Sequence, residues 1–200
     1  MKHKGMFVRV GFEVECSMTE TLPIFDAWVQ HPTPELLRSP MLASLLRWLH
    51  VEQLPEEIPL AMTTAALRSS GVKKALLTAW VGPEGALISN DQVAQCMKEE
   101  PDLYLGAASV DLRYPMEAVR ELRRCVNELG FKALRIMPWW WGWPPNDRRY
   151  YPLYAACVDL GIPFCLQVGH AGPLRASEPG RPIPYLDEVA LDFPELTIVA

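Results

Sequence analysis

The chain has 200 residues, half of them apolar, and a formal net charge of −5 at pH 7. This length and apolar content predict a single domain with one sizeable core. The acidic balance gives no electrostatic basis for binding nucleic acid or an anionic membrane, and no run of about eighteen apolar residues that could span a bilayer occurs.

The N-terminal segment, residues 1–21, has charges where a signal peptide needs its apolar centre. We therefore expect it to be an extension that precedes the folded domain at residues 22–200. The five cysteines are scattered, odd in number and without a CxxC pair. This usage is typical of a reduced, cytoplasmic protein rather than of a disulfide framework.

From Pro23 onward, short apolar runs alternate with segments of helical periodicity. The expected strands are residues 24–30, 72–80, 104–112, 131–137, 163–168 and 196–200. The expected helices are residues 35–49, 58–69, 90–99, 115–129, 153–160 and 185–191. Gly71, Gly130 and Gly161 each stand where a helix gives way to a strand, a position that favours a left-handed glycine.

Strands that alternate with helices and are apolar almost throughout indicate a parallel sheet covered on both faces. Right-handed crossovers restrict such a sheet to a doubly wound arrangement or a barrel. Six strands are visible, whereas a (β/α)8 TIM barrel typically takes about 250 residues. We therefore expect an α/β fold, a (β/α)8 TIM barrel seen through about strand six, with residues 196–200 paired to residues 163–168.

Four segments together resemble the amidohydrolase-related family, which includes decarboxylases of aminocarboxymuconate semialdehyde and of hydroxybenzoates. They are PIFDAWVQHP at 23–32, GFKALRIMP at 130–138, YPLYAACVDLGIPFCLQVG at 151–169 and PYLDEVALDFPELTIVA at 184–200. The resemblance covers about residues 22–200. It implies an amidohydrolase-like (β/α)8 barrel with its site at the carboxyl ends of the strands.

The resemblance also places metal-binding histidines at three positions that hold other residues here. The family's first strand ends in Asp-x-His-x-His, where this chain has Asp26 followed by Trp28 and Gln30, and Gln167 stands at the histidine of strand five. Tryptophan cannot bind a divalent ion, and a neutral amide is a poor ligand for a transition metal. We therefore expect no metal ligand among these residues, and as cofactor either none or a weakly bound divalent metal.

Two polar side chains could carry catalysis. Asp26 ends the first apolar run and is either a general base or the anchor of a loop. His170 follows the fifth strand and is either a general base near neutral pH or a brace within its loop.

Further side chains are candidates for substrate binding. Arg135 interrupts an apolar run, so its guanidinium must be paired, either with Asp26 or Asp111 or with an acidic ligand. Trp139 begins the run WWWGW, whose indoles cannot all be buried by one loop and should face a cavity, a lid or a partner subunit. Trp28, Gln30 and Gln167 would complete a neutral pocket that binds by hydrogen bonds and stacking.

The resemblance implies a hydrolase or carboxy-lyase, decarboxylase-like, that acts on a small, aromatic or unsaturated carboxylic acid. The alternative is a catalytically silent barrel used for ligand binding or oligomer assembly. In both cases the expected partners are a small molecule and a second copy of the chain in a homodimer, with no nucleic acid and no membrane.

Overall fold

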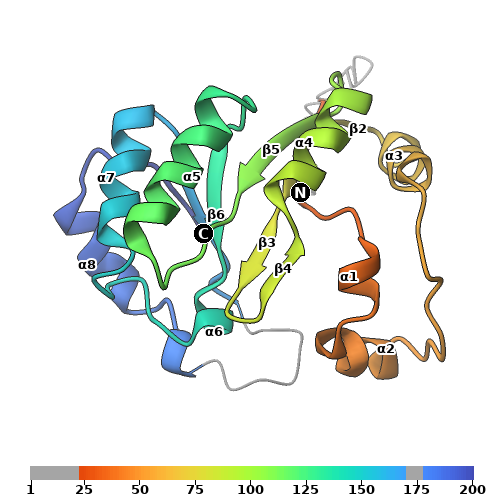
Figure 1. The fold of residues 1–200 in the computed structure, drawn as a ribbon, viewed down its shortest axis with the longest axis horizontal. Coiled ribbons are helices and arrows are strands. Elements are labelled where there is room, and N and C mark those ends of the chain that lie inside the picture. The colour runs from red at the N-terminus through yellow and green to blue at the C-terminus, as the bar shows by residue number, and fades with distance from the viewer. Residues whose placement is uncertain (1–22, 170–177) are drawn as a thin grey trace, which may run out of the picture.

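The computed structural model describes residues 23–169 and 178–200, so the expected N-terminal extension and His170 lie outside the described residues. One parallel sheet of six strands organises the fold, in the order β1-β2-β5-β6-β7-β8 (Figure 1). Its strands are β1 (Ile24–Val29), β2 (Val72–Thr78), β5 (Tyr104–Ala108), β6 (Ala133–Ile136), β7 (Phe164–Leu166) and β8 (Ile198–Val199).

The order of these strands is that of a barrel. Each crossover moves one place along the sheet in the same direction and never reverses, whereas a doubly wound sheet reverses once. The last strand, β8, pairs in parallel with β7, with Phe164 opposite Ile198. The predicted order of strands is therefore confirmed, and the sheet is the greater part of a (β/α)8 barrel.

Helices connect the strands, and those that follow β5 and β6 pack side by side along the sheet (Figure 1). The helices are α1 (Pro34–Leu37), α2 (Ala43–Trp48), α3 (Leu60–Ser69), α4 (Asn90–Glu99), α5 (Pro115–Asn127), α6 (Pro138–Trp141), α7 (Tyr151–Leu160) and α8 (Tyr185–Asp192). Gly71, Gly130 and Gly161 all have positive φ, as the sequence predicts for glycines that follow a helix. Among the described residues no helix is long and apolar enough to cross a membrane.

The two faces of the sheet bury different side chains. Ala75 and Leu77 of β2 belong to the main core beneath the helices, together with residues such as Phe164 of β7. The intervening Leu76 lies on the other face, in a small cluster with Ala107, Ala133 and Cys165. Because strand side chains alternate between faces, this second cluster marks the inside of the barrel.

The predicted helix at residues 35–49 is wrong in one respect, since it is two helices separated by a 3-10 turn, η1 (Pro40–Leu42). Pro40 has no N–H to continue α1 and pushes Ser39 into an extended conformation. The Ser39 hydroxyl then accepts the Met41 N–H and begins the new turn.

A β-hairpin of β3 (Trp80–Gly82) and β4 (Gly85–Ile88) lies outside the main sheet and was absent from the sequence prediction. The predicted strand at 72–80 ends at Thr78 instead, and Trp80 begins the hairpin. Gly85, at φ +116°, makes the turn possible because other residues rarely adopt that conformation.

The four indoles of WWWGW, which the sequence predicts cannot all be buried, divide into three that are buried and Trp143, which is partly exposed. Trp139, Trp140 and Trp141 are all buried, because they form the single turn of α6. Successive side chains on a helix point about 100° apart, so they enter different surroundings. Trp139 and Trp140 pack with Trp28 and Trp80, whereas Trp141 joins the main core.

Candidate functional site

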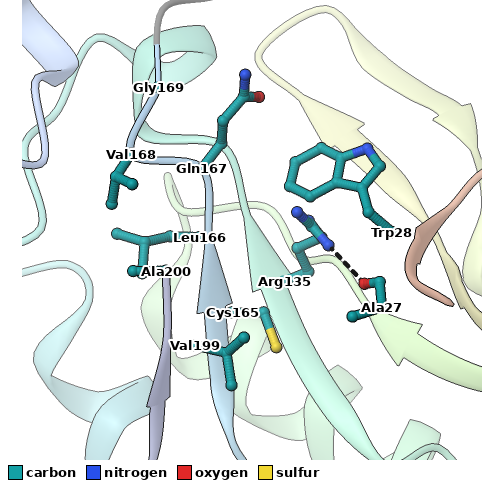
Figure 2. A pocket seen from close by; sticks show the side chains of 10 residues that line it. All are labelled: Ala27, Trp28, Arg135, Cys165, Leu166, Gln167, Val168, Gly169, Val199 and Ala200. Carbon is teal, nitrogen blue, oxygen red and sulfur yellow. Dashed lines mark hydrogen bonds between the residues drawn. The ribbon is translucent and has the colours of Figure 1, made fainter. Parts of the chain in front are cut away.

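A pocket of about 330 Å³ opens inside the barrel at the carboxyl ends of β6 and β7 (Figure 2). Its walls come from four strands and the residues that follow them. The lining residues are Ala27 and Trp28 from β1, Arg135 from β6, residues 165–169 on and after β7, and Val199 and Ala200 at β8.

A β-bulge in β1 shapes one side of this pocket. Between the pairs Asp26–Ala75 and Val29–Leu77, β1 advances three residues while β2 advances two. The extra residue allows the consecutive Ala27 and Trp28 both to line the pocket, whereas regular alternation would turn one of them away.

Among the described residues that line the pocket, Arg135 is the only basic one. Its side chain is only 5% exposed, on the same inner face of β6 as Ala133. Its Nη1 donates a hydrogen bond of 3.2 Å to the Ala27 carbonyl oxygen, and the guanidinium lies over the Trp28 ring (Figure 2). Burial lowers the pKa of Arg135 to about 10, so the side chain is still a cation at neutral pH.

The expected pairing of Arg135 with Asp26 or Asp111 is wrong. The Asp26 carboxylate accepts the backbone N–H of Trp28 at 2.9 Å, which is the loop-anchoring role. Asp111 forms a short ion pair with Arg113 and accepts its backbone N–H. Among the described residues no carboxylate pairs with Arg135, and its Nε is buried without a hydrogen-bond partner.

Cys165 is the residue opposite Arg135 on β7. Burial raises the pKa of its thiol above the ordinary value, although the neighbouring guanidinium acts in the other direction. The thiol is therefore neutral at pH 7 and supplies no counter-charge to Arg135.

Gln167 and Trp139 meet at the end of β7. The indole N–H of Trp139 donates to the Gln167 side-chain oxygen at 3.2 Å, so α6 and the residue after β7 are joined. Gln167 lines the pocket, whereas Trp139 is not among the lining residues and lies behind it. The structure thus brings Trp28, Arg135 and Gln167 directly together and connects Trp139 through Gln167.

An aromatic layer stands beside the pocket. The centroid of the Trp140 ring lies 6.4 Å from the ring centroid of Trp139 and 6.2 Å from that of Trp80. The indole N–H of Trp140 donates to Glu84 in the β3–β4 turn. A Cβ on Gly82 would overlap the Trp140 ring, so the hairpin packs directly against it. These contacts fix the hairpin over α6 and support the indole that holds Gln167.

Gln30 is placed differently from the other predicted binding residues. It follows β1 and is not among the residues that line the pocket, and its Nε2 is buried without a hydrogen-bond partner. The neighbouring His31 is turned to α3, with its Nδ1 at 3.0 Å from the Thr63 hydroxyl.

The described side chains around the pocket do not fit a divalent metal ion. Within residues 23–169 and 178–200 there is no group of three or more His, Cys, Asp or Glu side chains that could hold one. The guanidinium of Arg135 covers the Trp28 ring, and the Gln167 oxygen accepts the Trp139 N–H. A buried cation and hydrogen-bond donors would repel a second cation rather than bind it.

Comparison with known proteins assigns the family. The sequence profile of the amidohydrolase family matches residues 53–200, and the chain therefore belongs to that family. It is 31% identical over 86 residues to 2-amino-3-carboxymuconate-6-semialdehyde decarboxylase of Dictyostelium discoideum, a match that covers 41% of this chain and 24% of that protein. It is 35% identical over 93 residues to gamma-resorcylate decarboxylase of a Polaromonas species, covering 42% and 27%. The chain thus matches about a quarter of the length of these relatives.

Solved structures agree on the fold. An uncharacterized TIM-barrel protein from Bordetella bronchiseptica superposes with a TM-score of 0.70 and 26% identity, over 90% of this chain and 66% of that one. The 5-carboxyvanillate decarboxylase of Sphingomonas paucimobilis gives a TM-score of 0.62 at 16% identity, over 89% and 67%. The resemblance read from the sequence and the barrel it implies are both confirmed.

Two parts of the pocket were missed in the sequence. Cys165 precedes Gln167 by two residues on one strand, so alternation alone could have placed it on the same face. The Ala27 carbonyl could not have been found this way, because it faces Arg135 through the bulge and no sequence signal marks that bulge.

Proposed function

We propose that the protein is an amidohydrolase-type hydrolase or carboxy-lyase that acts on a small carboxylic acid, aromatic or unsaturated. The observation that carries this proposal is the Arg135 guanidinium, which is buried in the pocket without a carboxylate partner among the described residues. A buried charge is costly unless it is paired. A carboxylate fits its planar fork and would be the missing partner.

The walls of the pocket favour a flat and compact substrate. A volume of about 330 Å³ is near the lower end of the range for small-molecule pockets, which runs from about 300 to 1,000 Å³. The Trp28 ring and the apolar side chains of Leu166 and Val168 offer surfaces for a ring or a conjugated chain. Gln167 would orient a polar substituent of that ring.

The names of the relatives support the same chemistry. Two of the relatives are decarboxylases, and a third, 28% identical over 115 residues, is the 2-keto-4-carboxy-3-hexenedioate hydratase of a Sphingobium species. We propose that Arg135 binds the substrate carboxylate, with Trp28, Gln30, Trp139 and Gln167 forming and supporting the pocket. Asp26 is the proposed base; it precedes the lining residue Ala27, and to act it would have to release the Trp28 N–H that its carboxylate accepts. His170, outside the described residues, is the second candidate for proton transfer.

The test is an assay of the purified protein on 2,6-dihydroxybenzoate and a panel of related aromatic and unsaturated acids, following loss of the acid and release of CO2. In Arg135→Met, kcat/KM should fall by about 30- to 150-fold, because a charge-assisted hydrogen bond contributes about 2–3 kcal/mol. The matched control is Arg123→Met, which removes an exposed arginine paired with Asp159 on the helical face. An unchanged kcat/KM in Arg135→Met would refute the assignment.

A binding protein without catalysis is the second candidate, and one observation favours it. Among the described lining residues, Arg135 and Cys165 are the only ionisable ones, and neither is a general base at neutral pH. A protein that binds the acids of the panel but leaves them unchanged would support this alternative.

We also propose that the protein is a cytoplasmic homodimer. The four described cysteines are all free, and three of them are buried, which suits a reducing compartment. Apolar side chains are exposed on and after α2, including Trp48 and Leu49. Such a surface is of the kind that a second subunit covers.

A further inference from the structure

The buried polar atoms that lack partners share one chemical property. Within the described residues they are Gln30 Nε2, Trp80 Nε1, Arg135 Nε and Trp141 Nε1, and all four are hydrogen-bond donors. Gln30 and Trp80 follow the first two strands, and Arg135 stands near the end of β6. These three residues therefore lie at the end of the barrel where the pocket opens. Unpaired donors require an acceptor, and a metal cation cannot provide one.

The Arg135 guanidinium occupies the space between two strands that the family resemblance associates with metal ligands. It lies over the ring of Trp28, on β1, and points toward the same opening as Gln167, after β7 (Figure 2). Trp28 and Gln167 stand at two of the positions where the resemblance places histidines. These positions belong to the first and fifth strands of the barrel, which are β1 and β7. A permanent positive charge therefore stands at the place where the metal ligands would converge.

We propose that Arg135, held against Trp28, takes the place of a divalent cation, so that the protein binds the carboxylate of its ligand without a metal. The inference rests on the proposed function in one respect, that the ligand is a carboxylic acid. It adds the identity of the group that provides the positive charge.

The contacts of the guanidinium fit this role. Of its five N–H donors, Nη1 uses one on the Ala27 oxygen, at 3.2 Å. The Nε–H and the Nη2 group have no hydrogen-bond partner among the described residues. Together they form one side of the planar fork, and a carboxylate that reaches both groups accepts two parallel hydrogen bonds; because the Nε is buried, ligand binding must first uncover it.

Trp28 provides the support that the cation otherwise lacks. The face of an indole carries negative potential and stabilises a guanidinium placed over it, most strongly when water is excluded. The ring thereby replaces part of the hydration that Arg135 loses on burial, and does so without neutralising the charge. A carboxylate in the position of Trp28 would instead have formed an ion pair and left little positive field for a ligand.

The test measures binding, independently of turnover. The full-length protein is dialysed against a chelator, its metal content is measured by elemental analysis, and benzoate is titrated by calorimetry with and without added MnCl2 or ZnCl2. We expect benzoate to bind to the metal-free protein with an affinity that either salt changes by less than twofold. Arg135→Lys and Trp28→Leu should each weaken binding by about tenfold or more, Arg135→Met should abolish it, and the control Arg123→Met should leave it unchanged.

Thermal unfolding of the same variants separates a ligand site from a structural role. Removing an unpaired buried charge relieves a desolvation cost, so the unfolding temperature of Arg135→Met should equal or exceed that of the parent protein. A marked fall would mean that Arg135 holds the fold together and would overturn the inference.

The outcomes for the two proposals differ. Benzoate that binds only after a divalent ion is added would overturn the inference of metal-free binding and leave the proposed function intact. Failure of the whole carboxylic-acid panel to bind, with and without metal, would contradict the proposed function itself.

Discussion

At the scale of single residues, the described lining of the pocket combines one permanently charged side chain with neighbours that are neutral at pH 7. Arg135 is a cation, and burial keeps the opposite Cys165 thiol protonated. Such a charge without a partner lowers stability, and a protein keeps it where a ligand supplies the partner. The lining described here therefore has the field of an anion site rather than of a metal site.

His31, beside the end of β1, allows a prediction about pH. Burial lowers its pKa from the ordinary 6.5, and Glu99 and Glu57 only partly offset this. The unfolded chain therefore holds the proton more tightly than the folded one. The contribution of His31 to the free energy of unfolding should be constant above about pH 6.5. It should decrease as the pH drops from there through the lowered pKa of the folded protein.

The substitution His31→Gln tests this effect, because the amide can still bond to the Thr63 hydroxyl but cannot titrate. Urea unfolding at pH 7 and pH 5 should show a smaller acid-induced loss of stability in the variant than in the parent protein. An identical loss in both would show that the pH dependence arises elsewhere.

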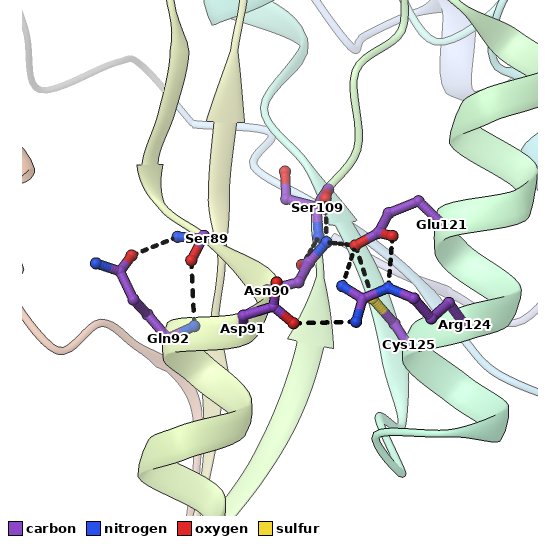
Figure 3. A network of polar contacts seen from close by, with 8 residues as sticks. All are labelled: Ser89, Asn90, Asp91, Gln92, Ser109, Glu121, Arg124 and Cys125. Atoms are coloured by element: carbon purple, nitrogen blue, oxygen red, sulfur yellow. Dashed lines mark hydrogen bonds and ion pairs between the residues drawn. The ribbon is translucent and has the colours of Figure 1, made fainter.

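At the scale of secondary-structure elements, one buried amide connects α4, the residue that follows β5, and α5 (Figure 3). The Asn90 side-chain oxygen accepts the backbone N–H of Ser109 at 3.0 Å. Its Nδ2 donates to the backbone carbonyl oxygen of Ser109 at 3.0 Å and to the Glu121 carboxylate at 2.8 Å. Ser109 in turn accepts the Val81 N–H of the hairpin through its hydroxyl. Arg124 lowers the pKa of Glu121, so this carboxylate is charged and pairs with it at neutral pH.

We predict that Asn90→Ala lowers the free energy of unfolding by about 2–3 kcal/mol, because it leaves the buried Ser109 N–H and C=O without partners. The control Asp91→Ala removes only an exposed ion pair with Arg124 and should cost less than about 1 kcal/mol. Chemical unfolding of both variants measures the difference. Equal losses in the two would argue against the bracing role of Asn90.

At the scale of the whole molecule, exposed apolar side chains lie on and just after α2, a helix that stands apart from α5 and α7 (Figure 1). Trp48 is 48% exposed and Leu49 is 61% exposed. Large side chains of this kind are costly in water, and they are enriched at the centres of interfaces.

If the proposed homodimer uses this surface, Trp48→Asp should convert the protein from dimer to monomer in analytical ultracentrifugation. Leu191→Asp, at the most exposed large apolar residue of α8, is the control and should leave the mass unchanged. A parent protein that sediments as a monomer at every concentration would dismiss the homodimer.

Sequence periodicity was enough to predict the larger elements and their order. Strand runs such as residues 24–30 and 72–80 and the helices between them were found because apolar spacing differs between strands and helices. The hairpin at Trp80–Ile88 and the turn of α6 were missed, since each of their elements has only three or four residues, too few to show a period. Their form depends on what they pack against, as the contact between Gly82 and Trp140 illustrates.

The sequence by itself determined the family and the parallel barrel. It also placed Trp28, Arg135 and Gln167 near the carboxyl ends of their strands, because all of this follows from local periodicity and from short sequence motifs along the chain. Only the tertiary structure decided which groups meet. Arg135 bonds to the Ala27 oxygen, 108 residues away, rather than to Asp26 or Asp111. Such a pairing depends on a bulge in another strand and on the curvature that brings β1 and β6 to one cavity, and neither is encoded in the spacing of residues near Arg135.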